Sequence, residues 1–138
     1  MDASSQFILY STWAHVISIF SLLAIIAYNY YTVSKEKEFF FLASKLKKFT
    51  PYFHSVNFIL AYTGATLAAF TWDMSPTVAL MIPVSLFLMI SEIKRYKKMR
   101  VIKLAQVELQ EEFKIFAKKI YTMQVIALVL MYIIAKVF

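Results

Sequence analysis

Charged residues are almost absent from two long stretches of the chain. None occurs from Ala3 to Ser34, and Asp73 is the only one from Phe49 to Ser91. A transmembrane helix needs about 20 predominantly apolar residues, and both stretches exceed that length. Of the 138 residues, 61% are hydrophobic and 17% are charged, whereas a soluble domain carries about 25% charged residues. The sequence therefore predicts an integral membrane protein.

Four apolar segments are long enough to be membrane-spanning helices. They cover residues 7–33, 51–72, 76–93 and 118–137. Thr50-Pro51 and Ser75-Pro76 place a hydroxyl residue directly before a proline, which is typical of the first turn of a helix. The length suffices for one domain. We therefore expect an all-α integral membrane four-helix bundle that occupies residues 1–138.

The basic residues lie in the two longer connections. Residues 35–48 carry a net charge of +3 and residues 92–119 a net charge of +5, and together they hold fourteen of the fifteen Lys and Arg residues. By the positive-inside rule this side is cytoplasmic, so both termini lie outside. Spans three and four should continue as helices into the cytoplasm, with a break near Leu104–Val107. Glu92 is interpreted as a carboxylate at the membrane boundary.

The composition excludes several classes of function and indicates lipid as a partner. Without cysteine there is no disulfide framework or iron–sulfur cluster, and a single glycine excludes glycine-rich phosphate loops. The net charge of +7 is explained by topology, so no nucleic-acid partner is expected. The basic cytoplasmic loops should contact anionic lipid head groups. Residues 39–48 should form a short amphipathic helix at the inner interface.

A polar stripe on the first helix supplies the main candidate site residue. Ser11, His15 and Ser18 follow i, i+4, i+7 spacing, and Asn29 lies three turns further on the same face. An ionisable residue at membrane depth is a functional candidate. A histidine can also serve only to hydrogen-bond a neighbouring helix. His15 is therefore a candidate cofactor and metal ligand, with a packing role as the alternative.

Small residues repeat at four-residue spacing on the second span. Such residues let neighbouring helices approach closely. They predict a helix-packing seam. The seam consists of Ala61, Gly64, Ala65 and Ala68.

Two histidines in an apolar chain suggest haem b, but their depths differ. His15 lies in the outer part of the first span and His54 near the inner edge of the second, about 15 Å apart in depth. One iron cannot bind both. Met81 and Met131 lie at depths compatible with His15, and methionine is a known axial ligand of haem. A site of His15 with one methionine therefore remains open.

Three stretches share features with a known group: Trp13–Ser18 in the first helix, Lys47–Pro51 before the second, and Phe113–Phe116 with an aliphatic helix that ends in Lys136. Together they resemble HemJ-type protoporphyrinogen oxidases, and more loosely CopD-like membrane domains. The resemblance implies a four-helix inner-membrane protein. It also implies His15 as the haem or porphyrin position, with Lys136 as a second candidate.

Other motifs of that family are replaced. Asn29-Tyr30 stands in place of a Pro-Arg pair, Ala79–Pro83 in place of a His-x-Lys motif, and Ala117–Ile120 in place of Asn-Glu-x-Pro. The resemblance thus implies a protein of the bacterial inner (cytoplasmic) membrane that binds haem or porphyrin through His15, and it does not carry over the oxidase activity. The alternative is a non-enzymatic accessory subunit or assembly factor of a larger membrane complex. The protein partners to expect are further copies of the chain in a homo-oligomer, or the subunits of such a complex.

Overall fold

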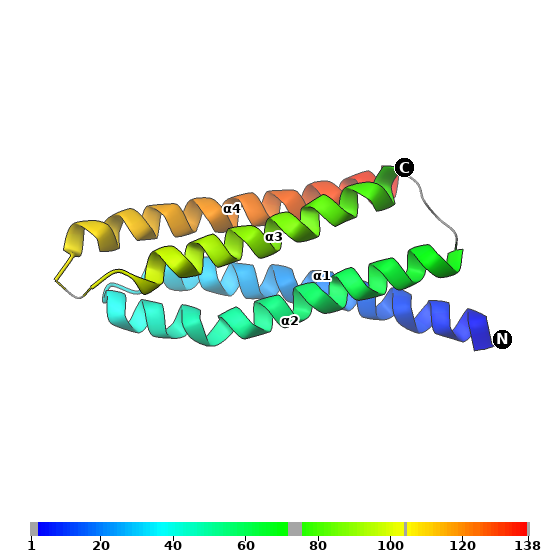
Figure 1. The fold of residues 1–138 in the computed structure, drawn as a ribbon, viewed down its shortest axis with the longest axis horizontal. Helices are drawn as coiled ribbons and strands as arrows, with labels where there is room; N and C mark the ends of the chain where they lie inside the picture. The colour runs from blue at the N-terminus through cyan, green and yellow to red at the C-terminus, as the bar shows by residue number, and fades with distance from the viewer. Residues whose placement is uncertain (1–2, 72–75, 104, 138) are drawn as a thin grey trace.

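The chain folds into four antiparallel helices that run side by side along one axis (Figure 1). The computed structural model describes residues 3–71, 76–103 and 105–137. The helices are α1 (Ala3–Lys35), α2 (Phe39–Thr71), α3 (Pro76–Arg100) and α4 (Val107–Val137). Both termini lie at the same end of the bundle (Figure 1). The predicted all-α four-helix bundle is confirmed.

The connections fall close to the predicted positions. α3 begins at Pro76, as its sequence predicts, and continues to Arg100, beyond the predicted span. α4 begins at Val107, so the break between these helices lies where the charge pattern indicates it. Trp72, at the end of the predicted second span, and the turn at Asp73 lie outside the described residues.

The predicted start of the second helix at Pro51 is wrong. α2 begins at Phe39 and continues through Pro51. Thr50, expected to cap the helix, is itself helical, and its hydroxyl donates to the carbonyl oxygen of Leu46 at 3.0 Å. Proline lacks an N–H and crowds the preceding turn. The helix accommodates this by bending in its first half rather than by ending (Figure 1).

Residues 39–48 are consequently not a separate interfacial helix. Their apolar face, with Phe39, Leu42 and Leu46, is buried in the core of the bundle. Phe39 packs edge to face on Phe113 of α4, with 5.8 Å between ring centroids. The first turns of α2 thus join the bundle instead of lying beside it.

Apolar side chains lie on the outer surface of the bundle as well as in its core. Phe58, Ile82 and Ile126 are 71%, 64% and 51% exposed, although polar groups such as Glu92 and Arg95 are fully buried. Soluble monomers rarely expose large contiguous apolar patches. This distribution of apolar and polar side chains suits a bundle whose outer surface contacts lipid.

Two of the four helices are long and apolar enough to cross a membrane, as judged from the described residues. They are Ser5–Lys35 and Val107–Ile134. α2 includes the polar residues His54 and Asn57, and α3 carries Glu92 within its length. The polar residues of α2 and α3 lower the mean hydropathy of these helices, whereas α1 has no charged residue before Lys35.

Substitutions of two phenylalanines on α2 test which face of this helix lies in the core and which lies on the outer surface. Phe53 is fully buried, whereas Phe58 is 71% exposed. We expect Phe53→Ala to lower the free energy of unfolding in detergent by about 3–5 kcal/mol, because it leaves a cavity in the core. Phe58→Ala should change it by less than about 0.5 kcal/mol. Similar losses for both variants would contradict the assignment of the two faces.

Candidate functional site

His15 lies against α2 in a defined orientation. Its Nδ1 is 3.0 Å from the Oγ1 of Thr63. The Thr63 oxygen also lies within hydrogen-bond distance of the carbonyl oxygens of Ile59, at 2.8 Å, and Leu60, at 3.1 Å. When the Thr63 hydroxyl donates to one of these carbonyls, its oxygen accepts from Nδ1–H of His15, and Nε2 then carries the free lone pair with which histidine binds metals.

The only glycine of the chain makes room for the His15 ring. A Cβ atom added at Gly64 would lie 3.2 Å from Cε1 and 3.7 Å from Nδ1 of His15. A contact of 3.2 Å is tighter than most real Cβ contacts. The missing side chain at Gly64 thus lets the imidazole lie directly on the backbone of α2.

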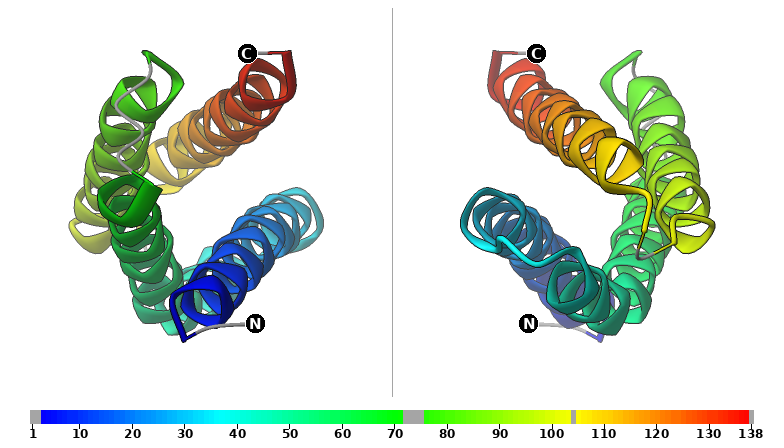
Figure 2. Two further views of the ribbon diagram at one scale, coloured as in Figure 1. Left: turned by 90° about the vertical axis from the view of Figure 1, so that its right-hand side faces the viewer. Right: turned by 90° about the vertical axis from the view of Figure 1, so that its left-hand side faces the viewer.

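His15 lines a cavity of about 710 Å³ in the half of the bundle that carries the termini. At this end the two helix pairs diverge, and α1 and α4 stand well apart (Figure 2). Met81 of α3 and Met131 of α4 line the same cavity. So do all four residues of the predicted seam: Ala61, Gly64, Ala65 and Ala68. Their role in close helix packing stays a prediction.

The cavity has the size of a small-ligand site, and its lining includes imidazole and thioether groups. Sites for small ligands are about 300–1,000 Å³ and mostly apolar. Imidazole and thioether groups are the axial ligands of haem in several proteins. Among the described residues, no group of three or more His, Cys, Asp or Glu side chains could hold a metal ion.

The other polar candidates of the sequence lie elsewhere. His54 packs edge to face on Phe53, with ring centroids 5.7 Å apart, and is not part of the cavity lining. It lies nine residues from Thr63 along α2, or about 14 Å. Ser18 donates to the carbonyl oxygen of Ala14 on its own helix at 2.8 Å. The partner that orients His15 is thus Thr63 rather than a serine of α1.

A second polar group lies at the opposite half of the bundle, around a buried ion pair. Nε and Nη2 of Arg95 donate to the same carboxylate oxygen of Glu92, at 3.1 and 2.6 Å, and both side chains are fully buried. Nη2 also donates to the Thr50 hydroxyl at 3.0 Å, and the guanidinium lies 5.7 Å from the ring centroid of Tyr121. Arg95 therefore links α2, α3 and α4.

Further polar groups surround this ion pair. Gln124 of α4 donates to the Ser91 hydroxyl of α3 at 2.8 Å. Asn29 of α1 is also buried, and its neighbour Tyr28 contacts Phe49, the residue before Thr50, with ring centroids 4.8 Å apart. We call this set the polar centre. It comprises Asn29, Thr50, Ser91, Glu92, Arg95, Tyr121 and Gln124.

The polar centre has unused hydrogen-bonding capacity. Within the described residues, five of its buried atoms have no hydrogen-bond partner: Oε2 of Glu92, Oη of Tyr121, Oε1 of Gln124, and both side-chain heteroatoms of Asn29. Leaving a buried polar group unpaired costs about 1–3 kcal/mol. Polar atoms in such a position are commonly satisfied by ordered water in native proteins.

Sequence reasoning missed most of the polar centre. Glu92 was expected at the membrane boundary, yet it is fully buried within the bundle. The signal that could have found it is the spacing of Glu92 and Arg95, three residues apart on a predicted helix, where opposite charges meet. Gln124 is a second signal, because it is an amide within an otherwise aliphatic segment.

Comparisons of the chain with protein-family models, with curated proteins and with solved structures found no match.

Loss of one member of the buried Glu92–Arg95 pair should destabilise the fold more than loss of both members together would suggest. Removal of one partner leaves the other charge buried without compensation, so Glu92→Leu and Arg95→Met should each lower the free energy of unfolding by about 3–5 kcal/mol. The double variant should lose much less than the sum of the two, since no isolated charge remains. Equilibrium unfolding in detergent measures all three.

The exposed pair of Lys45 and Glu36, 2.8 Å apart, provides the control. Lys45→Met should change stability by less than about 1 kcal/mol, because exposed ion pairs contribute little. Additive losses in the Glu92/Arg95 double variant would show that the two groups do not stabilise each other.

Proposed function

We propose that this protein binds haem or a porphyrin in the membrane and that His15 would hold the group. The observation that supports this most is the convergence of His15, Met81 and Met131 on one apolar cavity from three helices. The orientation of His15 by Thr63 adds to it.

The residues of the cavity have separate roles in this proposal. Thr63 would orient the ring of His15 through its contact with Nδ1, and Met81 or Met131 would offer a second donor atom to the group. The apolar walls exclude water from the macrocycle. Haem would supply a redox-active iron, whose potential depends on its axial ligands and its burial.

The proposal also assigns the chain a topology in the membrane. We infer that all four helices span the inner membrane and that both termini face the periplasm. The apolar outer surface supports insertion, and the fourteen basic residues of the two longer connections support the orientation. Both of these connections lie at the end of the bundle opposite the termini (Figure 1).

Reporter fusions test the topology. Alkaline phosphatase, which is active only in the periplasm, should be active when fused after Phe138 and inactive when fused after Lys103. Green fluorescent protein, which matures in the cytoplasm, should give the opposite pattern at the same positions. A fluorescent fusion after Phe138 would place the C-terminus inside and contradict the proposed orientation.

The absorption spectrum tests the ligand. Wild-type protein produced with abundant haem should show a Soret band after purification in detergent, and His15→Gln should abolish it, because an amide does not ligate iron well. Gly64→Leu should also abolish it, since even a Cβ at this position meets the His15 ring. Ala27→Leu, on an exposed position of α1, is the matched control and should retain the band.

Thermal unfolding of the same samples separates loss of haem from loss of fold. His15→Gln should remain folded, because an interhelical hydrogen bond in a membrane contributes only about 0.6 kcal/mol. A colourless wild-type protein, or a His15→Gln variant that keeps its colour, would refute the proposal. A colourless wild type would favour the alternative, an accessory subunit of a larger membrane complex.

A further inference from the structure

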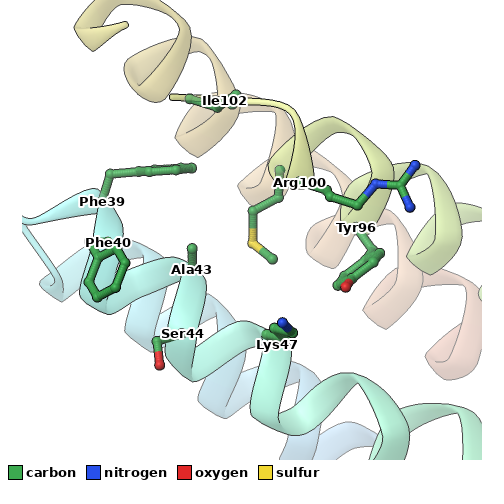
Figure 3. Close-up of a pocket in the computed structure, with 9 residues that line it drawn as sticks. Phe39, Phe40, Ala43, Ser44, Lys47, Tyr96, Arg100 and Ile102 are labelled. Carbon is green, nitrogen blue, oxygen red and sulfur yellow. The ribbon is translucent and has the colours of Figure 1, made fainter. Parts of the chain in front are cut away.

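A second cavity, of about 340 Å³, lies between the start of α2 and the end of α3 (Figure 3). This is the end of the bundle that we place at the cytoplasmic membrane surface. The lining includes Lys47 of α2 and Tyr96 of α3 beside apolar residues. The Lys47 side chain is exposed, so the cavity reaches the surface of the protein and water can enter it.

Met99 of α3 connects this cavity to the polar centre. Its side chain lines the cavity, although the residue is only 5% exposed. The Sδ atom of Met99 accepts a hydrogen bond from Nη1 of Arg95 at 3.6 Å. Arg95 itself is fully buried and is not part of the cavity lining. Met99 thus borders both the cavity and the buried guanidinium.

The polar centre has hydrogen-bonding capacity that the described residues do not fill. Glu92 and Tyr121 both contact the Arg95 guanidinium, and Gln124 lies one turn after Tyr121 on α4. A buried water molecule makes about three hydrogen bonds, so about two molecules would satisfy the five unpartnered atoms. These atoms are Oε2 of Glu92, Oη of Tyr121, Oε1 of Gln124 and both side-chain heteroatoms of Asn29.

The chemistry of these atoms favours water over an ion. The amide nitrogen of Asn29 only donates, whereas the free oxygen atoms of Glu92 and Gln124 only accept. A metal cation would serve the oxygens alone, and an anion would serve the nitrogen alone. The charges of Glu92 and Arg95 already balance each other within their ion pair. Water both donates and accepts, so it suits this mixed set of groups.

We infer that water enters the bundle from the cytoplasmic end through this cavity, passes Met99 and hydrates the polar centre. Water at this position would lower the desolvation penalty of the buried ion pair. The side chain of Met99 is flexible, so its movement would control how fast water passes. The direction of entry rests on the proposed membrane placement, and the inference is independent of the ligand at His15.

Radiolytic hydroxyl-radical labelling, read by mass spectrometry, tests for water at the polar centre of the protein in detergent. Radicals formed from bound water oxidise adjacent side chains even where bulk solvent is excluded. Tyr121 and Phe113 form a matched pair, because both are aromatic, fully buried residues of α4. Phe113 packs on Phe39 in the apolar core.

With each residue normalised to its labelling in unfolded protein, Tyr121 should be labelled severalfold more than Phe113. Equal labelling of the two rings would show that no water is specific to the polar centre and would overturn the inference.

The exchange rate of this water tests the route past Met99. Rapid mixing with water enriched in the heavy oxygen isotope, followed by labelling after increasing delays, measures how fast the isotope reaches Tyr121. Met99→Ala should shorten this time severalfold, because it removes most of the side chain between the cavity and Arg95. The control is Met89→Ala, the same substitution at a 38% exposed position of α3 that does not line the cavity. It should leave the time unchanged.

An exchange time that is the same in Met99→Ala, Met89→Ala and wild type would overturn entry past Met99. Thermal unfolding of the same samples establishes that each variant is folded at the temperature of the experiment. Met99→Val, a smaller truncation, replaces Met99→Ala if that variant does not fold. The comparison of Tyr121 with Phe113 needs no substitution, so the presence of water is tested in either case.

Discussion

The arrangement of the bundle depends on the buried guanidinium of Arg95. It contacts Glu92 on its own helix, Thr50 on α2 and the ring of Tyr121 on α4. Removal of a charge from water has a large desolvation penalty. The folded protein must therefore retain these contacts of Arg95, because they compensate that penalty. They fix the half of the bundle near the α3–α4 connection. The opposite half has no comparable centre among the described residues, and there the helix pairs diverge around the large cavity.

Two small features determine where the imidazole lies in that cavity. Gly64 lets the ring of His15 lie on the backbone of α2, and the Thr63 hydroxyl contacts its Nδ1. The position of the ring is thus set by adjacent residues on one helix. The methionines of α3 and α4 add thioether groups to the lining of the same cavity.

Much of this architecture could be predicted from the sequence, because it follows from apolar length and charge. The four helices, the start of α3 at Pro76 and the break before Val107 are of this kind. The continuation of α2 through Pro51 could not, since a Thr-Pro pair has the same sequence at a helix start and at a bend. The polar centre could not either, because burial of Glu92 depends on the register of neighbouring helices.

The residues of the candidate site could be predicted from the sequence, but their arrangement in space could not. Spacing identified His15 and the small residues, whereas the role of Thr63 and the shared cavity depend on how α1 meets α2. The most direct test of the account follows from Trp13, which lies two residues before His15. In a Trp72→Phe background, Trp13 fluorescence should be quenched saturably on titration with haem, at one haem per chain, and His15→Gln should remove this response. Quenching that does not saturate, or that persists without His15, would contradict a haem site at this histidine.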